Sequence, residues 1–179
     1  MLFRSIESQT TAGLTLGNVD SSNNAGDGLN VVDAASVTTT NSKLNSNGDD
    51  GIDFNSASGN LTVNGTNAAS NTAQGMNVSG ANGVTLAGGT FSGISVLNTN
   101  GFLAQTALIT STKPINVEAQ NGILLKASID AGANTIRFAA NLDGAGSEFF
   151  NMFGGTSMTT DRKSTLLNSS HIPLSRMPS

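Results

Sequence analysis

The chain has 179 residues, of which 85 are Gly, Ser, Asn or Thr, whereas 11% are charged and 4% are aromatic. It contains no Cys, Trp or Tyr, which excludes a disulfide scaffold and a globular core built on large aromatic rings. Disorder is also disfavoured, because disordered chains are usually rich in charge and proline, and this chain has 3 Pro and places its apolar residues in short patterned runs.

Short apolar runs that follow a glycine recur along the first half of the chain. Each run reads glycine, apolar, polar, apolar, and successive glycines are separated by nearly equal intervals until the last, which is shorter. Glycine accepts positive φ angles, so we expect these residues to form the corners where strands meet turns. The glycines are Gly28, Gly51, Gly75 and Gly93.

A second apolar motif has the same period. Its starting positions advance in step with the glycines through the first half, while isoleucines in the later part of the chain recur at a slightly shorter, constant interval. Two independent motifs with one period indicate a repeat architecture. The second motif begins at Leu14, Val37, Leu61 and Val84, and the later isoleucines are Ile94, Ile115 and Ile136.

These runs alternate apolar and polar residues, as half-buried strands do, and segments rich in Asn, Gly, Ser and Asp separate them. No helix of normal length fits the pattern, and residues 102–109 are the one loose candidate. The sequence therefore predicts an all-β fold: a single right-handed parallel β-helix, or β-solenoid, with about 21–24 residues per rung. We expect it to span residues 14–160, after an irregular start at residues 1–13.

In-register stacking places equivalent residues of successive rungs about 4.8 Å apart. We expect three core ladders: Leu29, Ile52 and Met76; Val37, Leu61 and Val84; and Ile94, Ile115 and Ile136. We also expect an outward polar ladder of Asn30, Asp53 and Asn77, in which the Asp53 carboxylate accepts hydrogen bonds from both sides.

Residues 47–54 (NGDDGIDF) and 59–65 (GNLTVNG) resemble the right-handed parallel β-helix repeats of pectin-lyase-like proteins. Residues 114–117 (PINV), 121–125 (NGILL) and 132–138 (GANTIRF) are more similar to the β-strand repeats of large bacterial surface adhesins of the haemagglutinin kind. Because such solenoids carry lyases, hydrolases, adhesins and passive spacers, the resemblance implies a fold more strongly than a function.

The last segment, residues 161–179, departs from the composition before it. Ten of the eleven residues from Asp161 to His171 match a translated sequencing adapter, and Leu166 stands where the adapter encodes Arg. We therefore interpret this tail as read-through, with a natural basic tail as the alternative. Without it the chain has five basic and eleven acidic residues, a net charge of −6 instead of −4, and no histidine.

The most chemically suggestive residues are four acids, Asp27, Asp49, Asp50 and Asp53. Asp27 and Asp50 precede equivalent glycines, so on neighbouring rungs their carboxylates would face each other and repel. A Ca²⁺ ion bound by Asp27, Asp50 and turn carbonyls would relieve this repulsion. The alternative is a set of solvated turn acids, because the calcium β-roll repeat and the EF-hand loop are both missing.

Catalysis is not expected from this segment. Polygalacturonase-like enzymes combine paired acids with His and Arg or Lys, whereas Asp49 and Asp50 have no such residue beside them in the sequence. Nucleic-acid binding is not expected either, because the five cations before residue 161 are scattered and no aromatic residues accompany them.

The sequence thus favours a structural or adhesive role in a larger exported bacterial surface protein, located outside the cell or at its surface. Its partners would be carbohydrate, matrix or other surface proteins. The alternative is a carbohydrate-active lyase or hydrolase domain whose active site is incomplete here. No run approaches the roughly 18 apolar residues of a membrane helix, so we expect no membrane span in this segment.

Overall fold

The structure is a computed structural model that describes residues 5–9, 13–56, 58–99, 102–140, 149–160 and 165–168. These residues form seventeen strands and no helix, which confirms the all-β prediction. Residues 102–109, the loose helix candidate, belong to a strand. The described part of the chain contains no helix that could cross a membrane.

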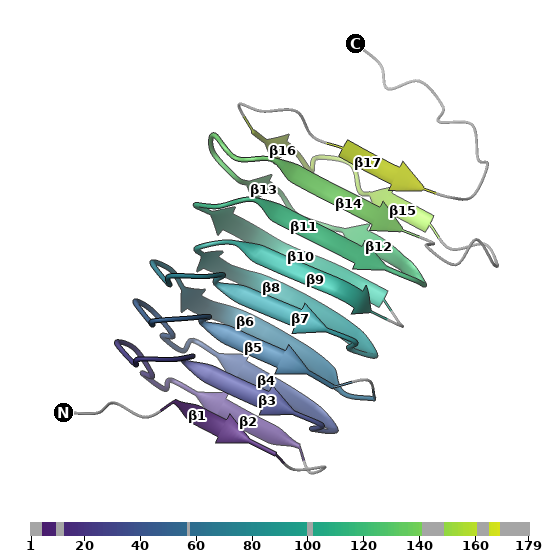
Figure 1. Cartoon of the computed structure of the whole chain (residues 1–179). Coiled ribbons are helices and arrows are strands. Elements are labelled where there is room, and N and C mark those ends of the chain that lie inside the picture. Colours follow the sequence, from purple (N-terminus) through teal and green to yellow (C-terminus); the bar gives the residue numbers. More distant parts are fainter. Residues whose placement is uncertain are drawn as a thin grey trace.

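The strands form two parallel sheets that lie on opposite sides of one core (Figure 1). We call them sheet A and sheet B. Sheet A contains, in spatial order, β1 (Ile6–Ser8), β3 (Leu29–Val32), β5 (Ile52–Asn55), β7 (Met76–Ser79), β9 (Ile94–Thr99), β11 (Ile115–Ala119), β14 (Ile136–Ala140) and β17 (Thr165–Asn168). Sheet B contains β2 (Leu14–Gly17), β4 (Ser36–Thr40), β6 (Asn60–Ala68), β8 (Gly83–Phe91), β10 (Phe102–Ser111), β12 (Gly122–Leu125) and β15 (Phe149–Met152), with β13 (Ile129–Asp130) and β16 (Met158–Thr159) continuing from β10.

The chain alternates between the two sheets and so winds into a coil. In Figure 1, sheet A runs from left to right in front and sheet B returns behind it, while the chain rises from the N-terminus to the C-terminus. This is a right-handed solenoid of about six turns. The hand is the one that parallel strands joined by crossover connections almost always adopt.

The predicted core ladders are confirmed. Ile52 pairs in register with Leu29 on one side and Met76 on the other, and Leu61 lies in the same way between Val37 and Val84. In the later turns, Ile115 lies between Ile94 and Ile136. All nine side chains are at most 2% exposed, so the repeat seen in the sequence is the repeat of the core.

Both ends of the chain add strands that the sequence did not predict. The segment expected to be an irregular start contains β1, which pairs in parallel with β3 from Ile6 onward. In the tail, β17 pairs with β14, and the rest of residues 161–179 lies outside the described residues. That this tail is adapter read-through stays a prediction.

Apolar residues of β15 pack against the C-terminal end of the core. Phe150, on β15, pairs with Ile123 and packs its ring against that of Phe138, with the ring centroids 5.7 Å apart. Phe153 lies beyond the strand and is 48% exposed, with the Lys126 ammonium 5.6 Å from its ring centroid.

The prediction that the repeated glycines form positive-φ corners is wrong for Gly28, Gly51 and Gly75, none of which has a positive φ. A side chain at these positions would have no room. A Cβ on Gly51 would lie 2.5 Å from Asn71 Nδ2 and 2.6 Å from the Gly75 carbonyl oxygen. Gly93 does have a positive φ, 158°, as predicted, and a Cβ there would also lie 2.2 Å from Gln74 Oε1.

We expect Gly51→Ala to lower the free energy of unfolding by about 2 kcal/mol, because the new methyl group would displace backbone atoms of the next turn. Urea denaturation followed by circular dichroism measures this. Gly17→Ala is the matched control, since a Cβ there meets nothing within 4 Å, and it should change the free energy by less than about 0.5 kcal/mol. Equal effects of the two substitutions would contradict the steric explanation.

Candidate functional site

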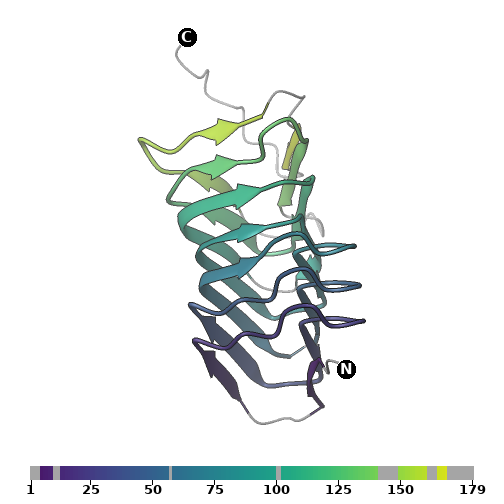
Figure 2. The same cartoon turned by 90° about the vertical axis from the view of Figure 1, so that its left-hand side faces the viewer.

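Three loops project from one side of the coil, each leading from sheet B to sheet A (Figures 1 and 2). We call residues 18–28 the first side loop, residues 41–51 the second and residues 69–75 the third. Backbone hydrogen bonds join them: the Gly48 N–H donates to the Asn24 carbonyl, and the Thr72 N–H donates to the Asn47 carbonyl. The three loops therefore form one stack that continues the strand pairing of the sheets.

An asparagine ladder supports the stack from inside. Asn24, Asn47 and Asn71 are 6%, 1% and 3% exposed. The Asn47 Oδ1 accepts from the Asn24 N–H at 2.9 Å, and the Asn71 Oδ1 accepts from the Asn47 N–H at 2.8 Å. We did not predict this ladder, although the three asparagines follow the same period as Gly28, Gly51 and Gly75.

The side loops bring the predicted acids together. Carboxylate oxygens of Asp27, Asp49 and Asp50 all lie within 4.8 Å of one another. Asp27 and Asp50 meet as their spacing predicts, and Asp49, the exposed member, joins them. We call these three residues the acidic cluster. On the next turn the equivalent residue is Gln74, so the vertical row of acids ends in a neutral amide.

Asp50 is the most enclosed member of the cluster, at 7% exposed. Its carboxylate accepts from the Gln74 N–H at 2.6 Å, while its own N–H donates to the Asp27 carboxylate at 3.0 Å. Burial raises the pKa of the Asp50 carboxyl, and the bond from Gln74 offsets part of this rise. Repulsion from Asp49 and Asp27 adds to it.

Asp53 lies beside the cluster on the outer face of β5. Burial, followed by repulsion from Asp27, Asp50 and Asp49, raises its pKa from 3.8 to about 6. The predicted outward ladder is present, because Asp53 pairs in register with Asn30 and Asn77. Its hydrogen bonding is one-sided, however: the Asn77 amide donates to Asp53 at 3.2 Å, whereas the Asn30 amide donates to Asp27.

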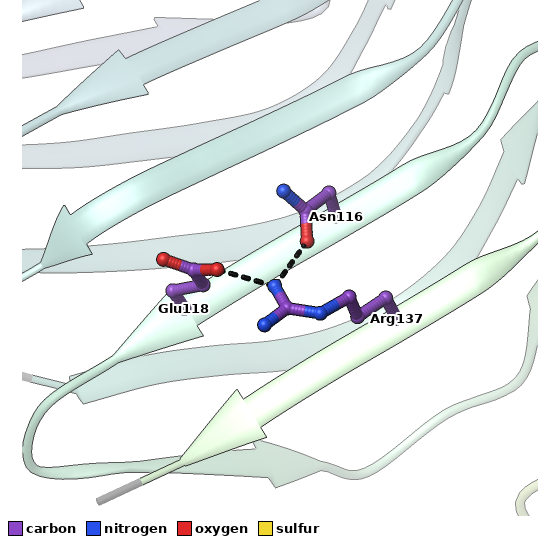
Figure 3. A network of polar contacts seen from close by, with 3 residues as sticks. All are labelled: Asn116, Glu118 and Arg137. Carbon is purple, nitrogen blue, oxygen red and sulfur yellow. Dashed lines mark hydrogen bonds and ion pairs between the residues drawn. The ribbon is translucent and has the colours of Figure 1, made fainter. Parts of the chain in front are cut away.

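The arginine on this face of the coil is occupied elsewhere. Arg137, on β14, forms an ion pair with Glu118 and donates to the Asn116 Oδ1 at 2.9 Å (Figure 3). Arg137 and Asp53 lie at equivalent outward positions of sheet A, four strand spacings apart, which is about 19 Å. Within the described residues, no ion pair joins the acidic cluster to a lysine or arginine.

The cluster is suited to two kinds of chemistry. Three carboxylates with nearby turn carbonyls provide the oxygen ligands that Ca²⁺ prefers. A carboxyl group with a raised pKa can also donate a proton as a general acid, provided that a second group stabilises the charge that develops on the substrate. The calcium site at Asp27 and Asp50 stays a prediction, and the structure places the carboxylate of Asp49 beside them as a third candidate ligand.

No family model, no curated protein and no solved structure matches the chain. The structure itself shows the parallel β-solenoid. The resemblance to pectin-lyase-like proteins and to adhesins rests on short sequence segments alone.

Asp53 should make stability depend on pH. Between about pH 4 and pH 6 the folded chain retains a proton that the unfolded chain has lost, so the free energy of unfolding should fall as pH rises through this window. Asp53→Asn should make this slope shallower, with the raised pKa of Asp50 still contributing to it. It should raise stability at pH 7 by about 1 kcal/mol, less than the full shift implies because the group is partly exposed to solvent. Urea denaturation at several pH values tests this, with Asp33→Asn as the control for an exposed acid. An unchanged slope in Asp53→Asn would contradict the assignment.

Calcium should stabilise the folded chain at pH 7 by relieving repulsion in the acidic cluster. A concentration about 100 times the dissociation constant would add about 2.7 kcal/mol. Thermal melts with calcium and with EDTA measure the effect, and Asp27→Asn and Asp50→Asn should each weaken it. The absence of any shift between calcium and EDTA would remove the calcium site.

Proposed function

We propose that this chain is a stiff structural or adhesive segment of a large exported bacterial surface protein. It would act outside the cell or at its surface and carry no catalytic activity of its own. The observation that carries the proposal is the continuous stack of buried residues, which runs through every turn from β3 to β14. The seven strands of sheet A that precede the tail, β1 to β14, span six spacings, or about 29 Å, so this segment would contribute that length to a spacer.

The outer face of sheet B supports a passive or adhesive role. Thr15, Thr38, Thr62 and Thr85 lie in register on β2, β4, β6 and β8. Their side chains point away from the core, and no charged residue lies on these four strands. Such a face offers hydroxyl groups at regular intervals to a carbohydrate, a matrix protein or another surface protein, without the strong charge that would select a nucleic acid.

A second candidate is a carbohydrate-active lyase or hydrolase domain, which the acidic cluster favours. Carboxylates this close together fit a retaining glycosidase better than an inverting one, whose acids stand about 6.5 to 9.5 Å apart. The cluster lacks a histidine, lysine or arginine partner among the described residues, and we therefore rank this function second.

One experiment separates the two functions. The purified chain is incubated with pectate and with neutral polysaccharides, and new reducing ends or unsaturated products are measured beside Asp50→Asn. A structural segment should give no product above the buffer blank with either protein, while retention on immobilised polysaccharide would indicate adhesion. Cleavage by the wild type that Asp50→Asn reduces at least about a hundredfold would establish the enzyme and overturn the proposal.

A further inference from the structure

The stack of side loops ends abruptly at the third loop. From the Gly75 position to the Gly93 position the repeat is shorter than in the turns before it, and β8 is followed almost at once by β9. No fourth loop is present to pair with the third (Figure 2). Backbone carbonyls on the upper side of the third loop would then have no donors from the next turn, which is costly for groups that are partly withdrawn from water.

In the lower loops, two carbonyls at equivalent positions receive N–H donors from the loop above. Those of Asn24 and Gly26 accept from Gly48 and Asp49. The second loop repeats this pattern. The carbonyls of its Asn47 and Asp49 accept from the N–H groups of Thr72 and Ala73 on the third loop. The same two positions on the third loop are Asn71 and Ala73.

The carbonyls of Asn71 and Ala73 both accept a hydrogen bond from the Lys113 ammonium group, with the Asn71 bond at 3.1 Å. The Thr72 carbonyl between them accepts from the same nitrogen at 2.8 Å. Lys113 comes much later in the chain, on the turn between β10 and β11. Lys113 therefore supplies the two hydrogen bonds that a further loop would have donated to Asn71 and Ala73, and adds a third to Thr72. Hydrogen bonds from a charged group are stronger than those between neutral groups.

Two neighbouring features fit this arrangement. The Ser111 hydroxyl donates to the Lys113 carbonyl at 2.8 Å and so fixes the turn from which the side chain descends. Gly93 lies under that turn, and a Cβ on Gly93 would lie 3.0 Å from the Lys113 Cβ. The glycine thus leaves room for the lysine to pass down to the third loop.

We propose that Lys113 is the cap of the side-loop stack: its ammonium group occupies a site built from the carbonyls of Asn71, Thr72 and Ala73, and holds the third loop in place where the stacking of loops ends. The cap is independent of the proposed surface role. It also steadies the acidic cluster, because Gln74, whose N–H donates to the Asp50 carboxylate, directly follows the capped carbonyls.

Hydrogen exchange followed by mass spectrometry on the full chain tests the cap. Lys113→Met keeps most of the stem and removes the donors, and it should speed exchange in residues 69–75 about tenfold or more, while residues 18–28 stay protected. Lys43→Met is the matched control: it removes the same charge from an exposed side chain of the second loop and should leave exchange in the third loop unchanged. Unchanged protection of residues 69–75 in Lys113→Met would overturn the proposal, as would global loss of the β signal in circular dichroism, because a cap acts on one loop.

Chemical rescue separates donors from charge. In Lys113→Ala, methylammonium should enter the vacated site and slow the exchange of residues 69–75. Tetramethylammonium at the same concentration has the same charge but no N–H groups, and it should not. Equal effects of the two ions, or no effect of either, would show that the lysine does not act by donating to these carbonyls.

Discussion

The requirement that each turn lie in register on the one before it is the constraint on which the whole molecule depends. A strand of this coil has no complete core and no complete set of hydrogen bonds by itself, since both are supplied by the turns above and below. Any residue that enters the stack must therefore fit its own neighbours and also the equivalent residues one period away. This explains why 37% hydrophobic residues are enough: each short run contributes a few side chains to ladders that pass through every turn.

The same constraint applies to the side loops and gives the polar residues their roles. Asn24, Asn47 and Asn71 connect successive loops through side-chain and backbone groups, so buried amides take the place that apolar ladders have between the sheets. Stacking also brings together groups that repel. Asp27 and Asp50 share one column, and the pKa values of Asp50 and Asp53 are raised as a result of burial and of these neighbours.

Much of the fold could be predicted from the sequence because glycines and apolar residues recur at a regular spacing along it. The ladders through Ile52, Leu61 and Ile115 followed from spacing alone, as did the meeting of Asp27 with Asp50. Spacing could not show why a particular residue type occupies a given position. Gly51 looked like a positive-φ corner and is in fact a point of close approach, which depends on Asn71 and Gly75 one turn later. The hydrogen bonds of Lys113 join segments far apart in the sequence and break the period, so no repeat pattern could predict them. β1 was missed because so short a strand shows no clear alternation.

The shortening of the repeat after Gly75 has a consequence for how such a coil can change in length. Lys113 donates to carbonyls of the last side loop and not to those of the two loops below it, each of which belongs to a turn one full period long. Duplication of one whole unit within the first turns would add a loop, a core layer and an acidic position while leaving the lysine contact as it is. Internal gene duplication can thus lengthen the stack of side loops one turn at a time, while Lys113 still caps its last loop.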